Sequence, residues 1–143
     1  MTAVELTREA DYAIRCVLEA ARHNRISTAE LAQHTELSPS FLGKIVGVLA
    51  RAGILETRRG AGGGVRLGRP ADAITVLEVI EAVQGPLHVN RCMRVPPACE
   101  RAQHCPILPL CREAQEALVA TFSVTFDHLL AEEGADPASA VAR

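Results

Sequence analysis

The chain has 143 residues, which suits one globular domain, and its 48% hydrophobic content is enough for a core that needs no disulfide or metal to hold it. Aromatic residues make up only 3% and Trp is absent, so aliphatic side chains fill that core and a mainly helical fold is expected. The net charge of -2 excludes a chain that is basic throughout, but it does not exclude a local DNA-binding surface.

No stretch of the sequence approaches the roughly 20 apolar residues that span a bilayer. The segment from Met1 to Arg8 lacks the apolar centre of a signal peptide. We therefore expect a cytoplasmic protein. In that reducing compartment, five cysteines with four inside a 20-residue stretch indicate metal ligands or redox thiols rather than structural disulfides.

Three helices are predicted in the first third of the chain. The first runs from Thr7 to about Arg22, where apolar residues recur at steps of three and four. A short second helix, with Ser27 or Thr28 as its N-cap, covers residues 29–34, and a third begins after the N-cap Ser38 and runs to about Ala52. The short turn between the second and third helices is typical of a helix-turn-helix.

A hairpin is predicted directly after this helix-turn-helix. Residues 54–57 and 65–67 flank a glycine-rich run, and glycine supplies the positive φ that a tight turn needs. From residue 44 to 69, six basic residues accompany a single acid, Glu56, so this segment carries a net charge of about +5. A flexible loop would share the glycines, but after a helix-turn-helix the run is better explained as the wing of a winged helix.

Residues 1–85 are therefore predicted to form a winged helix-turn-helix domain that binds double-stranded operator DNA. The start of the third helix would enter the major groove, and the wing would reach phosphates or the minor groove. The candidate DNA contacts are Ser38, Ser40, Phe41, Lys44, Arg58, Arg59 and Arg66. The alternative is that these side chains form only a solvated surface.

A fourth helix begins at the capping pair Thr75 and Glu78 and ends before Gly85. After it, residues 86–111 form an irregular loop that is rich in proline and cysteine. Loops of that length are uncommon in a compact domain unless they are functional, and a bound metal would supply the missing order.

The last predicted helix runs from about Leu110 to Ala131 and carries a broad apolar face. A symmetric dimer is the commonest way to cover such a face, so residues 112–131 are predicted to be a dimerisation helix. Residues 132–143 are predicted to be a flexible tail. The expected fold is mainly α, a winged helix-turn-helix domain with a long C-terminal dimerisation helix.

The cysteines of the loop are separated by six, five and five residues: Cys92, Cys99, Cys105 and Cys111. Zinc knuckles use separations of two to four residues, whereas these wider ones suit an iron–sulfur cluster, whose thiolate ligands stand farther apart. A structural zinc ion and a metal-free thiol switch are the alternatives. His104 is a further candidate ligand, and Cys16 is interpreted as a small core residue.

The order of helix-turn-helix, glycine-rich wing and cysteine loop resembles the Rrf-two family of bacterial transcription regulators over nearly the whole chain. The segments that carry this resemblance are Leu6-Thr7, Asp11-Tyr12-Ala13-Ile14-Arg15, Arg51-Ala52-Gly53, residues 58–64 and the cysteine loop. The resemblance implies a dimer with crossed long helices and an iron–sulfur cluster on three cysteines and a variable fourth ligand. It implies a regulator, in our interpretation a repressor, and not an enzyme.

Members of this family differ in the residue that supplies the fourth ligand of the cluster. IscR-like members use a His three residues past the last cysteine, and that place is Ala114 here, which argues against their arrangement. NsrR-like members use an acidic residue from the first helix of the opposite subunit. The match of the first helix puts Asp11 at that position.

The resemblance favours Cys99, Cys105 and Cys111 as the three thiolate ligands, and Cys92 or Asp11 then completes the set. A 4Fe-4S cluster is expected in preference to a 2Fe-2S cluster. With Asp11 as the weak fourth ligand, one iron would stay open to nitric oxide or oxygen. With four cysteines, a sensor of redox state or iron availability fits better.

Overall fold

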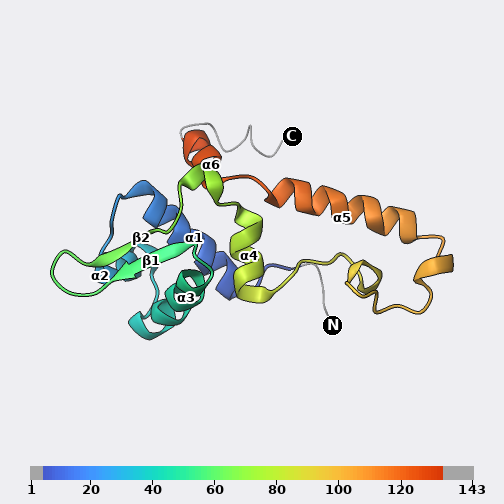
Figure 1. The fold of residues 1–143 in the computed structure, drawn as a ribbon, viewed down its shortest axis with the longest axis horizontal. Coiled ribbons are helices and arrows are strands. Elements are labelled where there is room, and N and C mark those ends of the chain that lie inside the picture. Colours follow the sequence, from blue (N-terminus) through green and yellow to red (C-terminus); the bar gives the residue numbers. More distant parts are fainter. Residues whose placement is uncertain (1–4, 134–143) are drawn as a thin grey trace.

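The computed structural model describes residues 5–133 (Figure 1). The elements in chain order are α1 (Arg8–Arg22), α2 (Thr28–Thr35), α3 (Pro39–Arg51), β1 (Leu55–Arg58), β2 (Gly64–Leu67), α4 (Val76–Gln84), α5 (Leu108–Phe122) and α6 (Phe126–Glu132). Three short 3-10 turns are η1 (Ala71–Ala73), η2 (Arg91–Met93) and η3 (Ala102–His104). The mainly helical fold with one small hairpin confirms the predicted fold class. No described helix is both long and apolar enough to cross a membrane.

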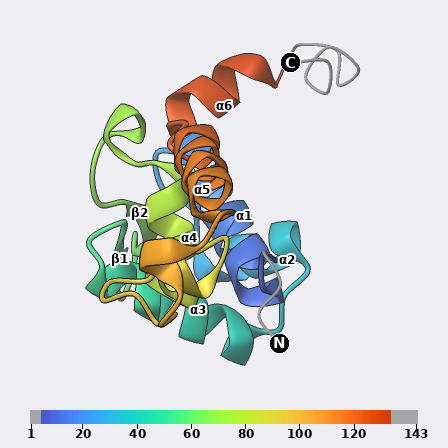
Figure 2. The same ribbon diagram turned by 90° about the vertical axis from the view of Figure 1, so that its right-hand side faces the viewer.

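The winged-helix body, which we define as residues 5–87 together with α6, surrounds a single apolar core. Helix α1 lies at its centre and packs against α2, α3, α4, α6 and β2 (Figures 1 and 2). The side of α1 that enters the core is made of small residues, among them Ala10, Ala13 and Ala20, so neighbouring helices can approach it closely. The predicted place of Cys16 in the core is confirmed, because its side chain is fully buried.

The helix boundaries of the body are set by local capping. Ser27 and Glu30 form a reciprocal capping box at the start of α2, and Thr75 and Glu78 form another at the start of α4. The hydroxyl of Ser38 accepts a hydrogen bond from the third residue of α3. These caps lie where the sequence predicted helix starts, since they depend only on residues three positions apart.

The hairpin of β1 and β2 is antiparallel, with Leu55 opposite Leu67 and Thr57 opposite Val65. Val65 is buried and also forms backbone hydrogen bonds with Ile26, which anchors the hairpin to the connection between α1 and α2. Gly64 at the start of β2 has φ of 144°, and a Cβ there would lie 2.5 Å from the Ile26 carbonyl oxygen. Glycine is therefore required at this position by the chain's own packing.

The predicted single helix from about Leu110 to Ala131 is wrong, because the chain forms two helices with a break at residues 123–125. At the break, Val76 donates a backbone hydrogen bond to Val124, and Phe126 donates one to Ile74. The ring of Phe126 is fully buried in the body. The apolar pattern continues across the break, so only these long-range contacts reveal that α6 turns back onto the winged helix.

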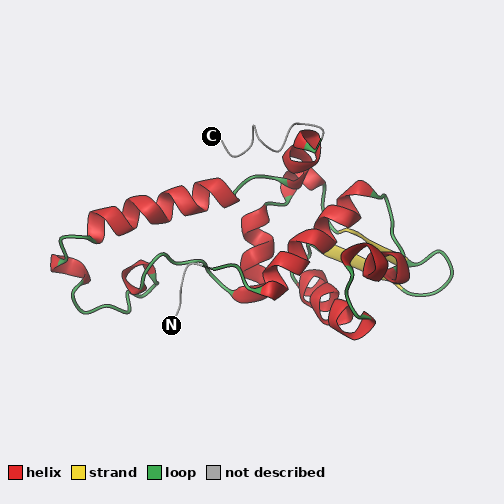
Figure 3. Cartoon of the chain, turned by 180° about the vertical axis from the view of Figure 1, so that it is seen from behind, coloured by secondary structure: helices red, strands yellow, loops and turns green. Residues whose placement is uncertain are grey.

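Residues 88–122, which we call the cysteine arm, extend away from the body (Figures 1 and 3). None of these residues is fully buried, and of the α5 side chains only the partly buried Leu118 and Phe122 pack against the core. Gln115 of α5 joins the arm to the body through a hydrogen bond to Leu87, which is a buried core residue. The predicted tail at 132–143 begins inside α6, and residues 134–143 lie outside the described part of the chain.

Candidate DNA-binding surface and cysteine loop

The start of α3 lies on the surface of the body, as a helix that enters a DNA groove must. Ser38, Ser40 and Lys44 are exposed there. The Ser38 hydroxyl is already an N-cap, and it remains accessible. Phe41 is half-buried, and its ring packs edge-on against Tyr12 of α1 with a centroid separation of 5.7 Å. Phe41 thus holds α3 against α1, while the side chains of Ser38, Ser40 and Lys44 lie outside the core.

Two glycines on α3 were not singled out in the sequence. A Cβ at Gly43 would meet no atom within 4 Å, and one at Gly47 would meet only the Arg51 guanidinium at 3.6 Å. The fold of the described chain therefore does not need glycine at either position, and each costs about 1 kcal/mol of helix stability relative to alanine. The pair, four residues apart, leaves a smooth strip of backbone that another surface can approach closely. Glycine at helical spacing in a predicted recognition helix was the signal available in the sequence.

The wing arginines differ in their surroundings. Arg58 and Arg59 are exposed, and within residues 5–133 no ion pair joins either to an acid. Arg66 instead makes a bidentate contact with Glu56, the residue directly opposite on β1, at 2.9–3.1 Å. Hydrogen bonds from Arg66 and its charge lower the pKa of the Glu56 carboxyl. Such an exposed pair is worth little in water, so a phosphate can compete for the guanidinium.

Arg25 contacts the tip of the wing, and sequence reasoning did not single it out. It precedes α2, and its guanidinium donates a hydrogen bond to the Gly62 carbonyl at the tip of the hairpin. The wing is thereby tied to the helix-turn-helix at its tip as well as at Val65. This contact spans 37 residues, so no local pattern could have revealed it.

The loop cysteines lie in the outer part of the cysteine arm. All four are half-buried and free thiols. Cys92 belongs to η2, which packs against α5, and Cys111 lies in the first turn of α5. Partial burial, a hydrogen bond with the Cys111 thiol and the nearness of Cys99 raise the pKa of the Cys92 thiol. Thiols from the two ends of the loop are thus neighbours.

This donor set fits an iron–sulfur cluster. Neighbouring thiols suppress each other's ionisation, and a bound cation reverses that effect because thiolates are its ligands. No three of the cysteines among the described residues bring their sulfur atoms within 4.8 Å of one another, which is the spacing that a single ion needs. A hollow of about 470 Å³ beside Cys99 is lined also by Arg91, Ala98, Glu100 and Arg101, so it leaves room for a larger group and carries one net positive charge.

Asp11 is exposed on α1 and forms an ion pair with Arg15 at 3.1 Å. Since α1 belongs to the body and the loop lies at the far end of α5, the fold of one chain does not bring Asp11 to the cysteines (Figure 1). His88, which was not singled out in the sequence, has an Nδ1 atom that is buried with no hydrogen-bond partner among the described residues. Cys92 is the fourth-ligand candidate that the chain itself brings to Cys111.

Comparison with known proteins gives this architecture its family. The model of Rrf2, described as an iron-dependent transcriptional regulator, matches residues 6–132. The chain belongs to the Rrf2 family. Its named homologues are transcriptional regulators and not enzymes, and the chain shares the winged-helix fold of solved members.

Individual relatives and solved structures are consistent with this family. The chain is 38% identical to protein aau3 of Rhizobium meliloti over 62% of its own length and 59% of that protein. It is 29% identical to the transcriptional regulator IscR of Xenorhabdus nematophila, over 89% of this chain and 79% of the relative. The structure of CymR, the global cysteine regulator of B. subtilis, superposes with a TM-score of 0.68 at 27% identity, covering 87% of this chain and 95% of CymR. The match with aau3 spans less than two thirds of that relative.

Proposed function

We propose that this chain is an iron–sulfur-dependent transcription regulator of the cytoplasm, in which the state of the cysteine loop sets the affinity for operator DNA. The observation that carries the proposal is the gathering of four half-buried free thiols on an arm that has no core of its own, attached to a winged helix. The cluster ligands are Cys99, Cys105 and Cys111, with Cys92 or Asp11 as the fourth. When bound, the cluster supplies an iron centre that redox change or nitric oxide can alter.

Gln115 is the residue that can carry the state of the loop to the body. It lies one helical turn after Cys111, its amide nitrogen donates to the Leu87 carbonyl, and its amide oxygen accepts from the Val89 N–H, both at 2.8 Å. Leu87 is in turn buried in the core. An ordered loop fixes the first turn of α5 and therefore this contact, which sets the angle between arm and winged helix.

The test is the operator affinity of anaerobically prepared holo and apo protein. A coupling of about 1 to 3 kcal/mol corresponds to a 5- to 150-fold difference between them. Gln115→Ala should shrink that difference, whereas Gln103→Ala, an exposed glutamine of the same arm, should leave it unchanged. Equal affinities of holo and apo protein would remove the sensor and leave the DNA-binding role intact.

For the DNA interface, we propose contacts by Ser38, Ser40, Phe41 and Lys44 of α3 and by Arg58, Arg59 and Arg66 of the wing. The exposure of Arg59 and the competing Glu56 beside Arg66 support a larger role for Arg59. Arg59→Ala should weaken binding to all DNA sequences and lower the salt slope by about one unit, and Arg66→Ala by less. An unchanged slope for both variants would exclude the wing from the interface.

The identity of the fourth ligand determines which signal the cluster responds to. If Asp11 of the opposite subunit completes the site, Asp11→Ala changes the anaerobic visible spectrum and the response to nitric oxide, and Cys92→Ala does not. If Cys92 completes it, the pattern is reversed, and a redox or iron-availability sensor follows. The contact of Cys92 with Cys111 supports the second arrangement.

A dimer is proposed because α5 leaves apolar side chains uncovered. Leu110 is 65% exposed and Val119 38%, and Ile107 at the N-cap of α5 is 51% exposed. Leu110→Asp should therefore halve the mass in sedimentation, while Val95→Asp, at an apolar position off the helix that is 94% exposed, should not. An unchanged mass for Leu110→Asp would move the dimer contact elsewhere.

The second candidate is a winged-helix regulator with a structural zinc ion or a metal-free thiol switch. The neighbouring Cys92 and Cys111 thiols favour it, since they could be oxidised to a disulfide. The visible spectrum separates the candidates, because zinc and disulfides give no band there. A colourless anaerobic protein would select the second candidate.

A further inference from the structure

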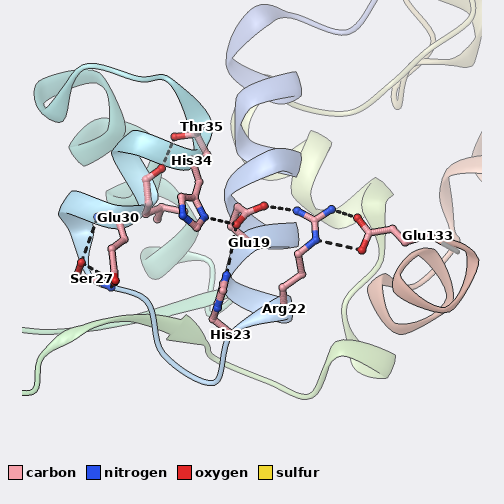
Figure 4. A network of polar contacts seen from close by, with 9 residues as sticks. Glu19, Arg22, His23, Ser27, Glu30, His34, Thr35 and Glu133 are labelled. Atoms are coloured by element: carbon pink, nitrogen blue, oxygen red, sulfur yellow. Dashed lines mark hydrogen bonds and ion pairs between the residues drawn. The ribbon is translucent and has the colours of Figure 1, made fainter.

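Three potential metal ligands meet at the junction of α1 and α2, far from the cysteine arm (Figure 4). They are Glu19 of α1, His23 at the C-cap of α1, and His34 of α2. Their ligand atoms all lie within 4.8 Å of one another. Within residues 5–133, no other set of three His, Cys, Asp or Glu side chains meets that criterion.

The helices bring these side chains together for a simple geometrical reason. Glu19 lies in the last turn of α1, and His23, four residues on, is the C-cap of that helix, so its backbone N–H donates to the Glu19 carbonyl and its ring lies beside the Glu19 carboxylate. His34 lies in the last turn of α2, which packs against α1. The Glu19 Oε2 atom accepts a hydrogen bond from His34 Nδ1 at 2.8 Å and lies 3.6 Å from His23 Nε2, so one carboxylate oxygen faces both imidazoles.

The other carboxylate oxygen of Glu19 is held in place. Arg22 donates to Glu19 Oε1 and also pairs with Glu133 beyond α6, so the carboxylate is clamped with Oε2 directed at the two rings (Figure 4). Burial raises the pKa of Glu19, but the hydrogen bond from His34 and the charge of Arg22 outweigh it, and the net shift is downward. The two carboxylates exceed the single guanidinium by one negative charge, which suits a bound cation.

We propose that Glu19, His23 and His34 form a binding site for a divalent transition-metal ion, with zinc as the ion of best fit. Two imidazoles and one carboxylate are a recurrent three-ligand set for tetrahedral zinc, whose fourth position is then taken by water. The two imidazole nitrogens argue against magnesium and calcium, which take oxygen ligands. The Glu19 side chain is 14% exposed, and those of His23 and His34 are 44% and 43%, so an ion can enter from solvent.

The ion would link α1 to the first helix of the helix-turn-helix. Besides their packing, the hydrogen bond from His34 to Glu19 joins the two helices, and the ion would replace it with bonds to both sides of the junction. Because the three ligands converge only in the folded body, zinc binding raises the melting temperature. This effect is independent of the cysteine arm and of its cluster.

Zinc binding is tested by calorimetry on the full-length chain after chelator treatment, with Cys92, Cys99, Cys105 and Cys111 replaced by serine so that the loop takes up no metal. One zinc ion per chain is expected. In this background His34→Ala and His23→Ala should each lower the affinity about tenfold or more. The matched control is His128→Ala, since His128 likewise lies four residues from a glutamate, Glu132, but has no third ligand beside it.

Thermal unfolding supplies a second measurement. Zinc should raise the melting temperature of the four-serine protein and of His128→Ala, and it should not raise that of His34→Ala. Circular dichroism shows whether each variant is folded, and Glu19→Gln replaces any histidine variant that is not. The absence of zinc uptake by the folded four-serine protein, or identical isotherms for His23→Ala, His34→Ala and His128→Ala, would overturn the proposal.

Discussion

Helices α1 and α5 both have 15 residues, yet α1 buries five of them and α5 buries none. The same contrast runs through the two regions to which they belong. Every fully buried apolar side chain of the described residues lies in the winged-helix body, and none lies between His88 and Thr125. The body is thus stabilised by its own core, whereas the cysteine arm needs a ligand or a second subunit to cover it.

The contrast also separates two kinds of cysteine. Burial and the nearby Glu19 charge raise the pKa of Cys16 to about 12, so this thiol stays protonated and serves as an apolar core group. The loop cysteines are half-buried and accessible to metal. One residue type therefore has a packing role in the body and, under the proposed function, a ligand role in the arm.

The largest effect is expected for Phe126→Ala. Phe126 fills the core of the body from α6, and removal of a buried aromatic ring costs about 3–5 kcal/mol of unfolding free energy. Val95→Ala, in the arm at 94% exposure, should change it by less than about 0.5 kcal/mol. Urea denaturation of the apo protein measures both, and a small loss for Phe126→Ala would mean that α6 is not part of the body.

A smaller loss of unfolding free energy is expected for Cys16→Ser, because this substitution puts a hydroxyl in the core. An unsatisfied buried polar group costs about 1–3 kcal/mol. Cys105→Ser should leave the unfolding free energy of the apo protein unchanged and instead abolish the visible absorption of the reconstituted protein. If Cys16→Ser also abolished that absorption while still folded, the division between packing and ligand cysteines would fail.

Removal of a helix cap tests the same difference between body and arm, with an expected change of about 1 kcal/mol in the unfolding free energy. Thr75 caps α4 in the body, and Thr75→Ala should lower the unfolding free energy by about that amount. Asn90 makes the corresponding contact at η2 in the arm, and Asn90→Ala should leave global unfolding unchanged. Equal losses in denaturation curves would show that arm and body unfold as one unit.

The smallest effect concerns pH. Because the folded-state pKa of Glu19 is lowered, its contribution to stability is present above the ordinary value of 4.5 and is lost as the pH falls through the folded-state value. In metal-free buffer at pH 7, Glu19→Gln should cost about 1 kcal/mol, and the difference from wild type should vanish on acidification. Glu81→Gln, an exposed substitution on α4, serves as the control and should show no such trend.

Local patterns in the sequence were sufficient for much of the fold. Ser27, Ser38 and Thr75 start helices where they were expected to, because a cap and the amide it satisfies lie within three residues. The hairpin followed from its glycines, and the order of the elements indicated the family. The candidate wing arginines were visible as a basic segment, but not the pairing of Arg66 with Glu56.

Contacts between distant segments lay beyond those patterns. The place of Cys105 in the loop was evident from its spacing, while the contact of Cys92 with Cys111 depends on how η2 folds back on α5. Glu19 and His34 meet across 15 residues, and no spacing rule joins two helices whose packing angle is unknown. The Gln115 contacts span 26 and 28 residues and were invisible for the same reason.

By itself, then, the sequence determined the first four helices and their caps, the wing and the cysteine spacing, since each is encoded within a few neighbouring residues. Only the tertiary structure decided that α6 returns to the core through Phe126, that α5 has no fully buried side chain, and that a carboxylate and two imidazoles converge between α1 and α2. Burial of apolar surface selects among the arrangements that the local pattern permits, and that selection depends on the whole chain.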